Sequence, residues 1–288
     1  MGRMIRIYLK NGSVTGIRHS EIINWSGQAI FIPRSQMKEL EEWDESKKPG
    51  VYFLFGVDEN SIDKKAVYIG ESENILSRLN DHLSKKEFWN EAIFFTSKDD
   101  NLTKSHIKYL EARLIEVSKE AQRYTILNNT GGTFSSLPRG DKDSMEEFIS
   151  NIRILLGTMG HKVLEPMINL TKQFSQPVEE NNDIELTFSK NNKLFVRAIY
   201  TDEGIVVKKG SEANKETRSS LSNGYKTLKE TLVNEGILKE KDQDLYEFTD
   251  NYLFKSSSQA AAVIVGYSIS GPQSWYHNGK TLKEIEEN

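Results

Sequence analysis

The sequence predicts an α+β fold, in which a small domain with a three-stranded sheet flanked by helices precedes a separate C-terminal α+β domain. Short runs rich in β-branched and aromatic residues predict the strands at 51–55, 66–69 and 92–96, and longer amphipathic segments predict helices. A length of 288 residues suggests two domains, and a polar stretch without periodicity separates them. The expected parts are an N-terminal β-rich extension (1–46), the small domain with a trailing helix (47–170), a linker (171–183) and a C-terminal domain with a binding role (184–288).

The N-terminal extension is expected to begin with a β-hairpin. Arg3–Leu9 has a strand-forming composition, Asn11-Gly12 is typical of a tight hairpin turn, and Val14–Arg18 is expected to return as the second strand. The apolar run Ala29–Pro33 predicts a further strand. The segment 35–43, with a serine at its first position as N-cap, predicts a short helix.

Three helices are expected in and after the central domain. The first covers Glu73–Leu83 with Ser72 as its N-cap, and the second is the longer segment Thr103–Gln122. The third, Lys142–Met159, follows a Pro-Arg-Gly turn and ends at Gly160. In the C-terminal domain we expect strands at 184–188, 194–200 and 204–208, and helices around 219–235 and 257–266.

Composition and charge limit the function. Hydrophobic residues make up 37% and charged residues 28%, as in ordinary soluble globular proteins, and no apolar run is long enough to span a bilayer. The N-terminal stretch does not resemble a signal peptide, and the absence of cysteine excludes disulfides, zinc ribbons and thiol nucleophiles. We therefore expect a cytoplasmic protein without a membrane partner. The net charge of −4 means that any contact with nucleic acid must come from a local basic face.

The helix predicted over 73–83 carries a polar stripe beside its apolar face. Asn74, Arg78 and His82 are spaced by four residues, so they lie along one edge of the apolar arc. A guanidinium offers a fixed fork of donors and an imidazole titrates near neutral pH, a combination suited to binding an anion. The same spacing is typical of a solvated helix edge, and this helix alone does not decide between the two. The apolar arc comprises Ile75, Leu76, Leu79 and Leu83.

The helix predicted over 103–122 places a carboxylate, that of Glu111, within its apolar face. Desolvating a carboxylate is costly, so such a position is usually occupied only by a group that is paired or bound to a metal ion. Two interpretations stay open, a metal ligand or a buried ion pair with Arg78 as the candidate partner. The surrounding apolar residues are Ile107, Leu110, Leu114 and Ile115.

Two tyrosines lie at the ends of predicted strands, each with a glycine nearby. Tyr52 follows Gly50 at the start of the first strand, and Tyr68 precedes Gly70 at the end of the second. A strand tyrosine usually belongs to the core or its rim. A glycine beside it would, however, let another backbone or a phosphate approach closely.

Together these elements resemble the GIY-YIG nuclease superfamily. GVY at 50–52 and YIG at 68–70 look like its paired motif, and Arg78 with His82 look like its R-x-x-x-H step. The helix glutamate in YLEARLI, Glu111, and an asparagine in the following ILNN continue the match in the expected order. Each motif is weak alone, but five elements in this order on a strand–strand–helix–strand–helix frame are specific.

The resemblance shows small departures and also extends outwards. Valine replaces the central isoleucine of GIY, the loop VDENSIDKK is long for the family, and the family asparagine is either Asn128 or Asn129, of which we favour Asn128. The stretch GIRHSEIINWSG is similar to the N-terminal piece of one bacterial subgroup. The segment FKSSSQAAAVIVGYSISGPQSW is similar to an uncharacterised domain attached to such nucleases.

The resemblance implies a metal-dependent endonuclease that hydrolyses phosphodiester bonds in nucleic acid, with DNA as the expected substrate. Glu111 would ligate Mg²⁺ or Mn²⁺, and Arg78 would bind a non-bridging phosphate oxygen. Tyr52 or Tyr68 would orient or deprotonate the attacking water. His82 would position a tyrosine or this water.

The resemblance gives Asn128 a bracing role and leaves other questions open. Cutting both strands with one small site requires either a homodimer or two successive events. One alternative is a non-catalytic nucleic-acid-binding or regulatory protein that retains the fold. Another is a structural protein in which the same polar residues form a closed, mutually hydrogen-bonded cluster.

The C-terminal domain offers weaker candidates for binding. Trp275 and Tyr276 would suit stacking on a base, although filling the core of a small domain is the more usual role of such a pair. Asn278-Gly279 predicts a tight turn after them. Lys208 and Lys209, at a strand end, either touch phosphate or are simply solvated.

Overall fold

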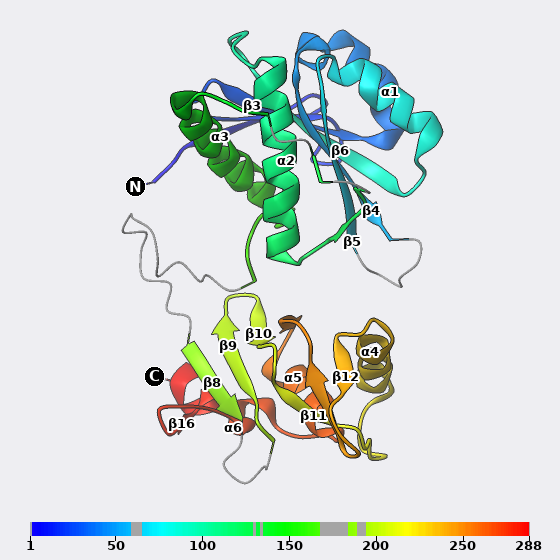
Figure 1. Cartoon of the computed structure of the whole chain (residues 1–288), viewed down its shortest axis with the longest axis vertical. Helices are drawn as coiled ribbons and strands as arrows, with labels where there is room; N and C mark the ends of the chain where they lie inside the picture. The colour runs from blue at the N-terminus through cyan, green and yellow to red at the C-terminus, as the bar shows by residue number, and fades with distance from the viewer. Residues whose placement is uncertain are drawn as a thin grey trace. The chain divides into compact units, whose positions relative to one another are not determined.

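The structure is a computed structural model that describes residues 2–58, 65–128, 131–132, 135–167, 184–188 and 194–287 (Figure 1). The chain divides into two compact units, Met1–Pro166 and Met167–Asn288. Each unit has its own hydrophobic core. The linker predicted at 171–183 lies outside the described residues. No helix in the described ranges is long and apolar enough to cross a membrane.

The first unit is built on a seven-stranded sheet with the order β1-β2-β3-β6-β4-β5-β7. Neighbouring strands are antiparallel except β5 and β7, which run parallel. The three strands predicted for the central domain form its middle. The sheet is wider than three strands because β3 pairs with residues 91–97 of β6, on the edge of β6 that faces away from β4. The strands are β1 (Ile5–Leu9), β2 (Arg18–Ile22), β3 (Gly27–Pro33), β4 (Gly50–Val57), β5 (Lys65–Ser72), β6 (Trp89–Ser97) and β7 (Thr125–Ile126).

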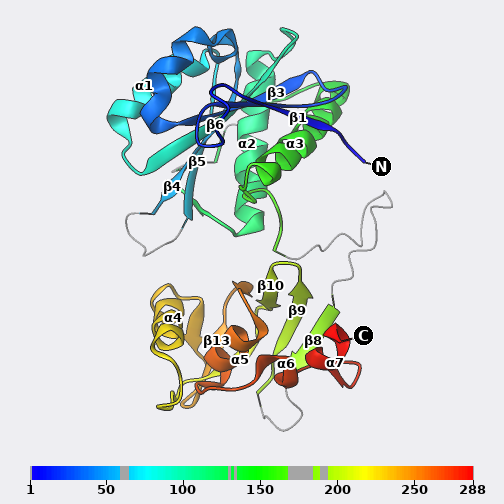
Figure 2. The same cartoon turned by 180° about the vertical axis from the view of Figure 1, so that it is seen from behind.

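Helices cover both faces of this sheet, as Figures 1 and 2 show from opposite sides. Helices α2 and α3 pack on one face, whereas α1 and the 3-10 helix η1 pack on the other. Alternation along β4 sends Val51 and Phe53 into the core beneath α2, and Tyr52 and Leu54 toward α1. The predicted α+β class is thereby confirmed. The helices are η1 (Arg34–Glu42), η2 (Asp44–Lys47), α1 (Ile75–Lys85), α2 (Lys104–Ala121) and α3 (Arg139–Thr158).

The second strand of the N-terminal hairpin lies later in the chain than predicted. The return strand is β2 rather than 14–18, and the last pair of the ladder joins Leu9 to Arg18. Gly12 adopts the positive φ of 66° expected of a turn glycine. The turn that it makes belongs to a longer loop, so the Asn-Gly dipeptide marked a bend but did not fix the length of the connection.

Two helix caps also differ from the prediction. The N-cap of α1 is Asn74 rather than Ser72, because the Asn74 side chain accepts a hydrogen bond from the Ser77 backbone at 3.0 Å. The Ser72 hydroxyl instead donates to the Asn74 carbonyl and accepts from the Asn74 backbone N–H, before the helix begins. Helix η1 begins after Pro33 and has no side-chain cap, so Ser35 does not act as one.

The described residues of the second unit form two sheets and four helices. A six-stranded sheet has the order β14-β10-β9-β8-β15-β16, and a three-stranded sheet has the order β11-β13-β12. Helix α5 is buried from Ala260 to its last residue, Val265, and contributes five residues to the core. The elements are β8 (Ile184–Phe188), β9 (Arg197–Thr201), β10 (Gly204–Val207), β11 (Glu212–Asn214), α4 (Asn223–Asn234), β12 (Leu238–Glu240), β13 (Leu245–Phe248), β14 (Tyr252–Phe254), α5 (Ser257–Val265), α6 (Gly271–Ser274), β15 (Trp275–His277), β16 (Lys280–Thr281) and α7 (Leu282–Glu286).

Of the aromatic pair in the second unit, Trp275 belongs to the core, whereas Tyr276 is half-buried. Trp275 is fully buried, and its indole N–H donates to the Ser257 carbonyl at 3.0 Å, so its ring is not available to a base. Asn278-Gly279 forms the predicted turn, with φ values of 49° and 85° between β15 and β16. Lys208 forms an ion pair with Glu185 at 2.8 Å, which favours the solvated interpretation of this strand end.

Candidate active site

The α1-facing side of the first sheet brings together Tyr52, Tyr68 and the polar stripe of α1. Tyr52 lies directly opposite Gly70 in the β4–β5 ladder. A Cβ at Gly70 would lie 2.2 Å from the Tyr52 hydroxyl oxygen, so only glycine leaves room for the ring. The sequence suggested that a backbone or a phosphate would approach this glycine, but the space beside Gly70 is taken by the side chain of Tyr52.

The hydroxyl of Tyr52 joins two side chains of α1. It forms a hydrogen bond with His82 Nε2 at 2.8 Å and accepts one from Arg78 Nε at 3.2 Å. Arg78 and His82 reach the same oxygen because they lie one helical turn apart. Tyr52 is fully buried, and burial raises its pKa despite the opposing effect of Arg78. Tyr52 is thus a neutral anchor that holds Arg78 and His82 in register.

Tyr68 stands beside this network with its hydroxyl uncommitted. Its ring packs edge-on against His82, with 5.3 Å between the ring centroids. The ring is half-buried, and within the described part of the chain its hydroxyl has no hydrogen-bond partner. The Lys86 ammonium lies 4.1 Å from the centroid of the Tyr68 ring.

Lys86 is a neighbour of the site that the sequence analysis missed. It continues the four-residue spacing of Arg78 and His82, which is the signal that would have found it. The helix was predicted to end at residue 83, but α1 extends to Lys85 and uses Lys86 as its C-cap. Asn74, at the other end of the stripe, serves as the N-cap and takes no part in the network.

Arg78 and Glu111 approach from opposite sides of the sheet, from α1 and α2. Arg78 is exposed, and no carboxylate lies within ion-pair distance of it among the described residues. The half-buried Glu111 therefore makes no direct ion pair with Arg78, which removes that interpretation of its position. Burial raises the pKa of the Glu111 carboxyl, and the charge of Glu71 adds to the effect, while the Glu71 backbone and Arg78 oppose it.

The surroundings of Glu111 fit a divalent cation. Burial and the neighbouring Glu71 both disfavour the negative charge on Glu111, and a bound cation would compensate that charge. Among the described residues, no three acidic or histidine side chains converge to hold a metal by themselves. The residues present thus suit an ion that takes a carboxylate from the protein and its other oxygens from water and phosphate.

Asn128 is hydrogen-bonded to the backbone of the YIG segment. Its Oδ1 accepts from the Ile69 N–H at 3.0 Å, and its Nδ2 donates to the Ile69 carbonyl at 2.7 Å. The amide thereby extends the short β5–β7 ladder by one step and fixes the backbone between Tyr68 and Gly70. Asn129, the alternative family asparagine, lies outside the described residues.

A short way beyond Asn128, the chain lies against helix α2 beside Glu111. A Cβ at Gly132 would lie 2.8 Å from the Cα of Ala112, the residue after Glu111. The backbone at this point therefore rests directly on the helix. Five of the predicted side chains thus flank the end of β5, namely those of Tyr52, Tyr68, Arg78, His82 and Glu111. Asn128 supports that strand from its outer edge.

His82 should make the first unit less stable in mild acid. Burial, with the cations Arg78 and Lys86 adding to it, lowers the pKa of His82 to about 4 from 6.5, and Nδ1 is buried with no partner among the described residues. The unfolded chain therefore binds this proton at a higher pH than the folded one, so the free energy of unfolding falls as the pH drops from 6.5 toward 4.

We expect the titration of His82 to lower the free energy of unfolding by about 1–3 kcal/mol as the pH falls from 6.5 to 4. Urea denaturation at a series of pH values measures it. His82→Gln, which keeps a polar group facing Tyr52 but cannot titrate, should show a smaller loss. Parallel curves for the two proteins would mean that His82 does not cause the pH dependence.

Comparison with protein families agrees with this geometry. Residues 48–125 match the GIY-YIG catalytic domain, and residues 186–286 match the domain of unknown function DUF4357. No match was found among curated proteins or among solved structures. The first match covers β4, β5, α1, β6 and α2, and thus includes Tyr52, Tyr68, Arg78, His82 and Glu111. The chain thus carries a GIY-YIG catalytic domain over residues 48–125, followed by a DUF4357 domain over residues 186–286.

Proposed function

We propose that this protein is a metal-dependent endonuclease that hydrolyses phosphodiester bonds in nucleic acid, with DNA as its substrate. The observation that carries the proposal is the state of three groups at the end of β5. Arg78 is exposed without an ion-pair partner among the described residues, the Tyr68 hydroxyl is uncommitted there, and the half-buried Glu111 has no cation paired with it in the same ranges. A purely structural cluster would use these groups to satisfy one another.

Tyr68 is the better candidate for contact with the attacking water. A general base must be within hydrogen-bond reach of the proton that it removes. The Tyr52 hydroxyl is fully buried and already bound to two side chains, whereas that of Tyr68 has no partner among the described residues. Lys86 places a positive charge over the Tyr68 ring, where negative charge develops as the proton leaves.

Arg78 provides the positive charge for the phosphate. Its Nε is fixed by Tyr52, so the two terminal nitrogens of the guanidinium project as an oriented pair of donors. Such donors stabilise a phosphorane-like transition state most when they are already in place before the reaction. His82 acts through Tyr52 and is therefore a positioning residue.

Glu111 would hold the Mg²⁺ or Mn²⁺ ion, which when bound polarises the phosphate and favours ionisation of a water. Glu111 itself supplies the anchoring oxygen on α2, opposite Arg78 on α1. The Asn128 amide keeps the intervening YIG backbone in place. The substrate phosphate would then lie across the end of β5, between the two helices.

Phenylalanine at each tyrosine should separate the two roles. Tyr68→Phe removes the hydroxyl that contacts the water, so we expect kcat to fall by about 10²–10⁴-fold with little change in stability. Tyr52→Phe removes the buried hydrogen bond with His82 and the partly buried one from Arg78, so we expect it to cost about 1–3 kcal/mol of stability in addition to a loss of rate. Single-turnover cleavage and urea denaturation on both variants measure these effects. A larger rate loss for Tyr52→Phe with unchanged stability would reverse the assignment.

Supercoiled plasmid incubated with Mg²⁺, with Mn²⁺ and with EDTA tests the proposed activity. We expect nicking or linearisation that requires the metal. A nicked product indicates one cut at a time, and direct linearisation indicates paired sites, as in a homodimer. Branched DNA, single strands and RNA extend the test to other substrate forms. Binding to these substrates without cleavage of any would support the alternative, a non-catalytic nucleic-acid-binding protein.

A further inference from the structure

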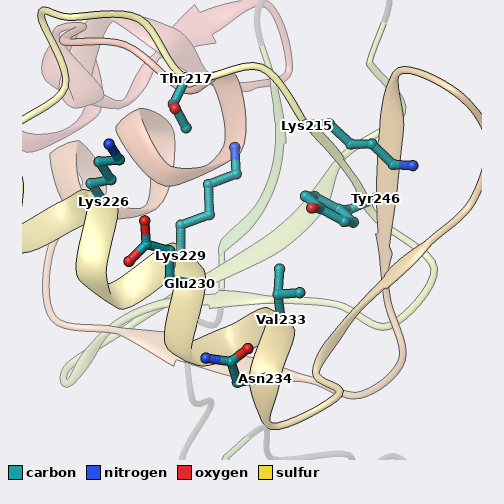
Figure 3. A pocket seen from close by; sticks show the side chains of 8 residues that line it. All are labelled: Lys215, Thr217, Lys226, Lys229, Glu230, Val233, Asn234 and Tyr246. Carbon is teal, nitrogen blue, oxygen red and sulfur yellow. The ribbon is translucent and has the colours of Figure 1, made fainter.

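A pocket of about 350 Å³ lies in the second unit, between helix α4 and the strands β11 and β13 (Figure 3). Helix α4 contributes five of its lining residues, the segment after β11 contributes Lys215 and Thr217, and β13 contributes Tyr246. This volume falls within the range of about 300–1,000 Å³ that is typical of small-molecule sites. None of its residues belongs to the candidate active site in the first unit.

Lys229 is the most unusual residue of this pocket. It is only 3% exposed, and it reaches from α4 toward Thr217 and Lys215 (Figure 3). Its ammonium donates to the Asn214 carbonyl, and among the described residues no carboxylate lies within ion-pair distance. Burial lowers its pKa to about 8. An ammonium has three donors, so two of them are left without a protein acceptor in the described part of the chain.

Two further lysines, Lys226 and Lys215, make the pocket positive. Lys226 lies on α4 near Lys229, is exposed and has no ion-pair partner among the described residues. Lys215 is held by Glu240 at 3.0 Å. Glu230 is the one acidic residue in the described lining, so the cations outnumber the anions. A buried cation without a counter-charge is costly, and a bound anion would supply that charge.

Glu230 does not neutralise these lysines. It follows Lys226 by one turn of α4 and is exposed, and no ion pair joins the two within the described ranges. Glu230 is also adjacent to Lys229 in the sequence, but among the described residues it makes no ion pair with the Lys229 ammonium. The pocket therefore keeps a local positive charge that the protein itself leaves unbalanced.

The donor set favours a phosphate group over other anions. The described lining contains ammonium groups and the Thr217 hydroxyl but no guanidinium, and ammonium groups bind a phosphate as point charges without a planar fork. The two ammonium groups of α4, on Lys226 and Lys229, together with the Thr217 hydroxyl from the segment after β11, suit a tetrahedral group with several oxygens. The phenol of Tyr246 and the side chain of Val233 add an aromatic and an apolar surface beside these donors.

We propose that this pocket binds the phosphate of a nucleotide, with the ammonium groups of Lys229 and Lys226 and the Thr217 hydroxyl as donors and with Tyr246 bordering the base. The nucleotide is either a free mononucleotide or one unit of a nucleic-acid strand, because both present the same phosphate and base. The pocket lies in the DUF4357 domain, so the proposal does not depend on cleavage by the other unit.

Calorimetric titration of the full-length protein tests this site, with EDTA present so that no metal-dependent cleavage occurs. The probes are inorganic phosphate, dTMP and a short oligothymidylate. We expect saturable binding of dTMP or of the oligonucleotide, with inorganic phosphate competing. Tighter binding of dTMP identifies a free nucleotide as the ligand, and tighter binding of the oligonucleotide that Lys226→Gln weakens identifies a strand bound in this pocket and not at the candidate active site. The absence of saturable binding for all three probes would overturn the proposal.

Variants locate the binding in this pocket. Lys226→Gln and Lys229→Met should each weaken the binding by about tenfold or more. Lys239→Gln is the matched control, because Lys239 is an exposed lysine of the same unit that does not line the pocket. Equal affinities for all three variants and the wild type would contradict the assignment. If Lys229→Met fails to fold, the exposed Lys226 decides the outcome.

Discussion

Replacing Glu111 with glutamine is expected to abolish metal-dependent cleavage while the fold is retained. Glutamine keeps the volume of the side chain but removes the charge that would anchor the cation, so we expect the cleavage rate to fall by about 10³-fold or more. Stability should be unchanged or higher at neutral pH. The raised pKa of Glu111 means that its charged form is disfavoured in the folded state, and its contribution to stability falls as the pH rises above 4.5.

Two measurements separate a lost metal ligand from a damaged fold. Mg²⁺ should raise the melting temperature of the wild type but not that of Glu111→Gln, since only a protein that binds the ion is stabilised by it. Glu120→Gln, at an exposed glutamate on the same helix, is the matched control and should behave as the wild type. Cleavage by Glu111→Gln at the wild-type rate would remove Glu111 from the site.

Replacing Arg78 with alanine is expected to lower kcat by about 10²–10³-fold while KM changes much less. The guanidinium is held by Tyr52 before substrate arrives, so its main contribution is to the charge that develops in the transition state. Arg78→Lys keeps a positive charge but loses both the Nε contact with Tyr52 and the fork of donors. It should therefore recover only a small part of the rate.

The control for this series is Arg6→Ala. Arg6 is exposed on β1 and faces Glu21 at 3.6 Å, away from the proposed active-site residues. Single-turnover kinetics should give equal rates for this variant and the wild type. A rise in KM with unchanged kcat for Arg78→Ala would instead show that Arg78 serves only in binding the ground state.

The central strands and helices were predictable because their patterns are strong. The strands β4, β5 and β6 have β-branched and aromatic composition, and α2 has a long apolar stripe. The extent of the sheet was not predictable in this way. The pairing of β3 with β6 joins segments roughly sixty or more residues apart, and nothing in the local sequence specifies such a partner.

The candidate site was predictable as a set of residues but not as an arrangement. The spacing of Arg78 and His82 indicated a shared edge of α1, and the structure shows that both contact Tyr52. The difference between the two tyrosines could not be read from the sequence. It depends on burial, which differs on one face of the sheet because Tyr52 lies on the inner strand β4, whereas Tyr68 lies on β5, next to the edge strand β7.

The hydrogen bonds between Asn128 and Ile69 have a consequence for how this protein tolerates insertions. Asn128 is tied to the edge of the sheet, and Gly132, four positions later, rests on α2 beside Glu111. The length of this connection is thus limited at both ends. Adding or removing a residue between these two points would shift either the support of the YIG backbone or the contact with the helix. Related sequences should vary more in the identity of these residues than in their number.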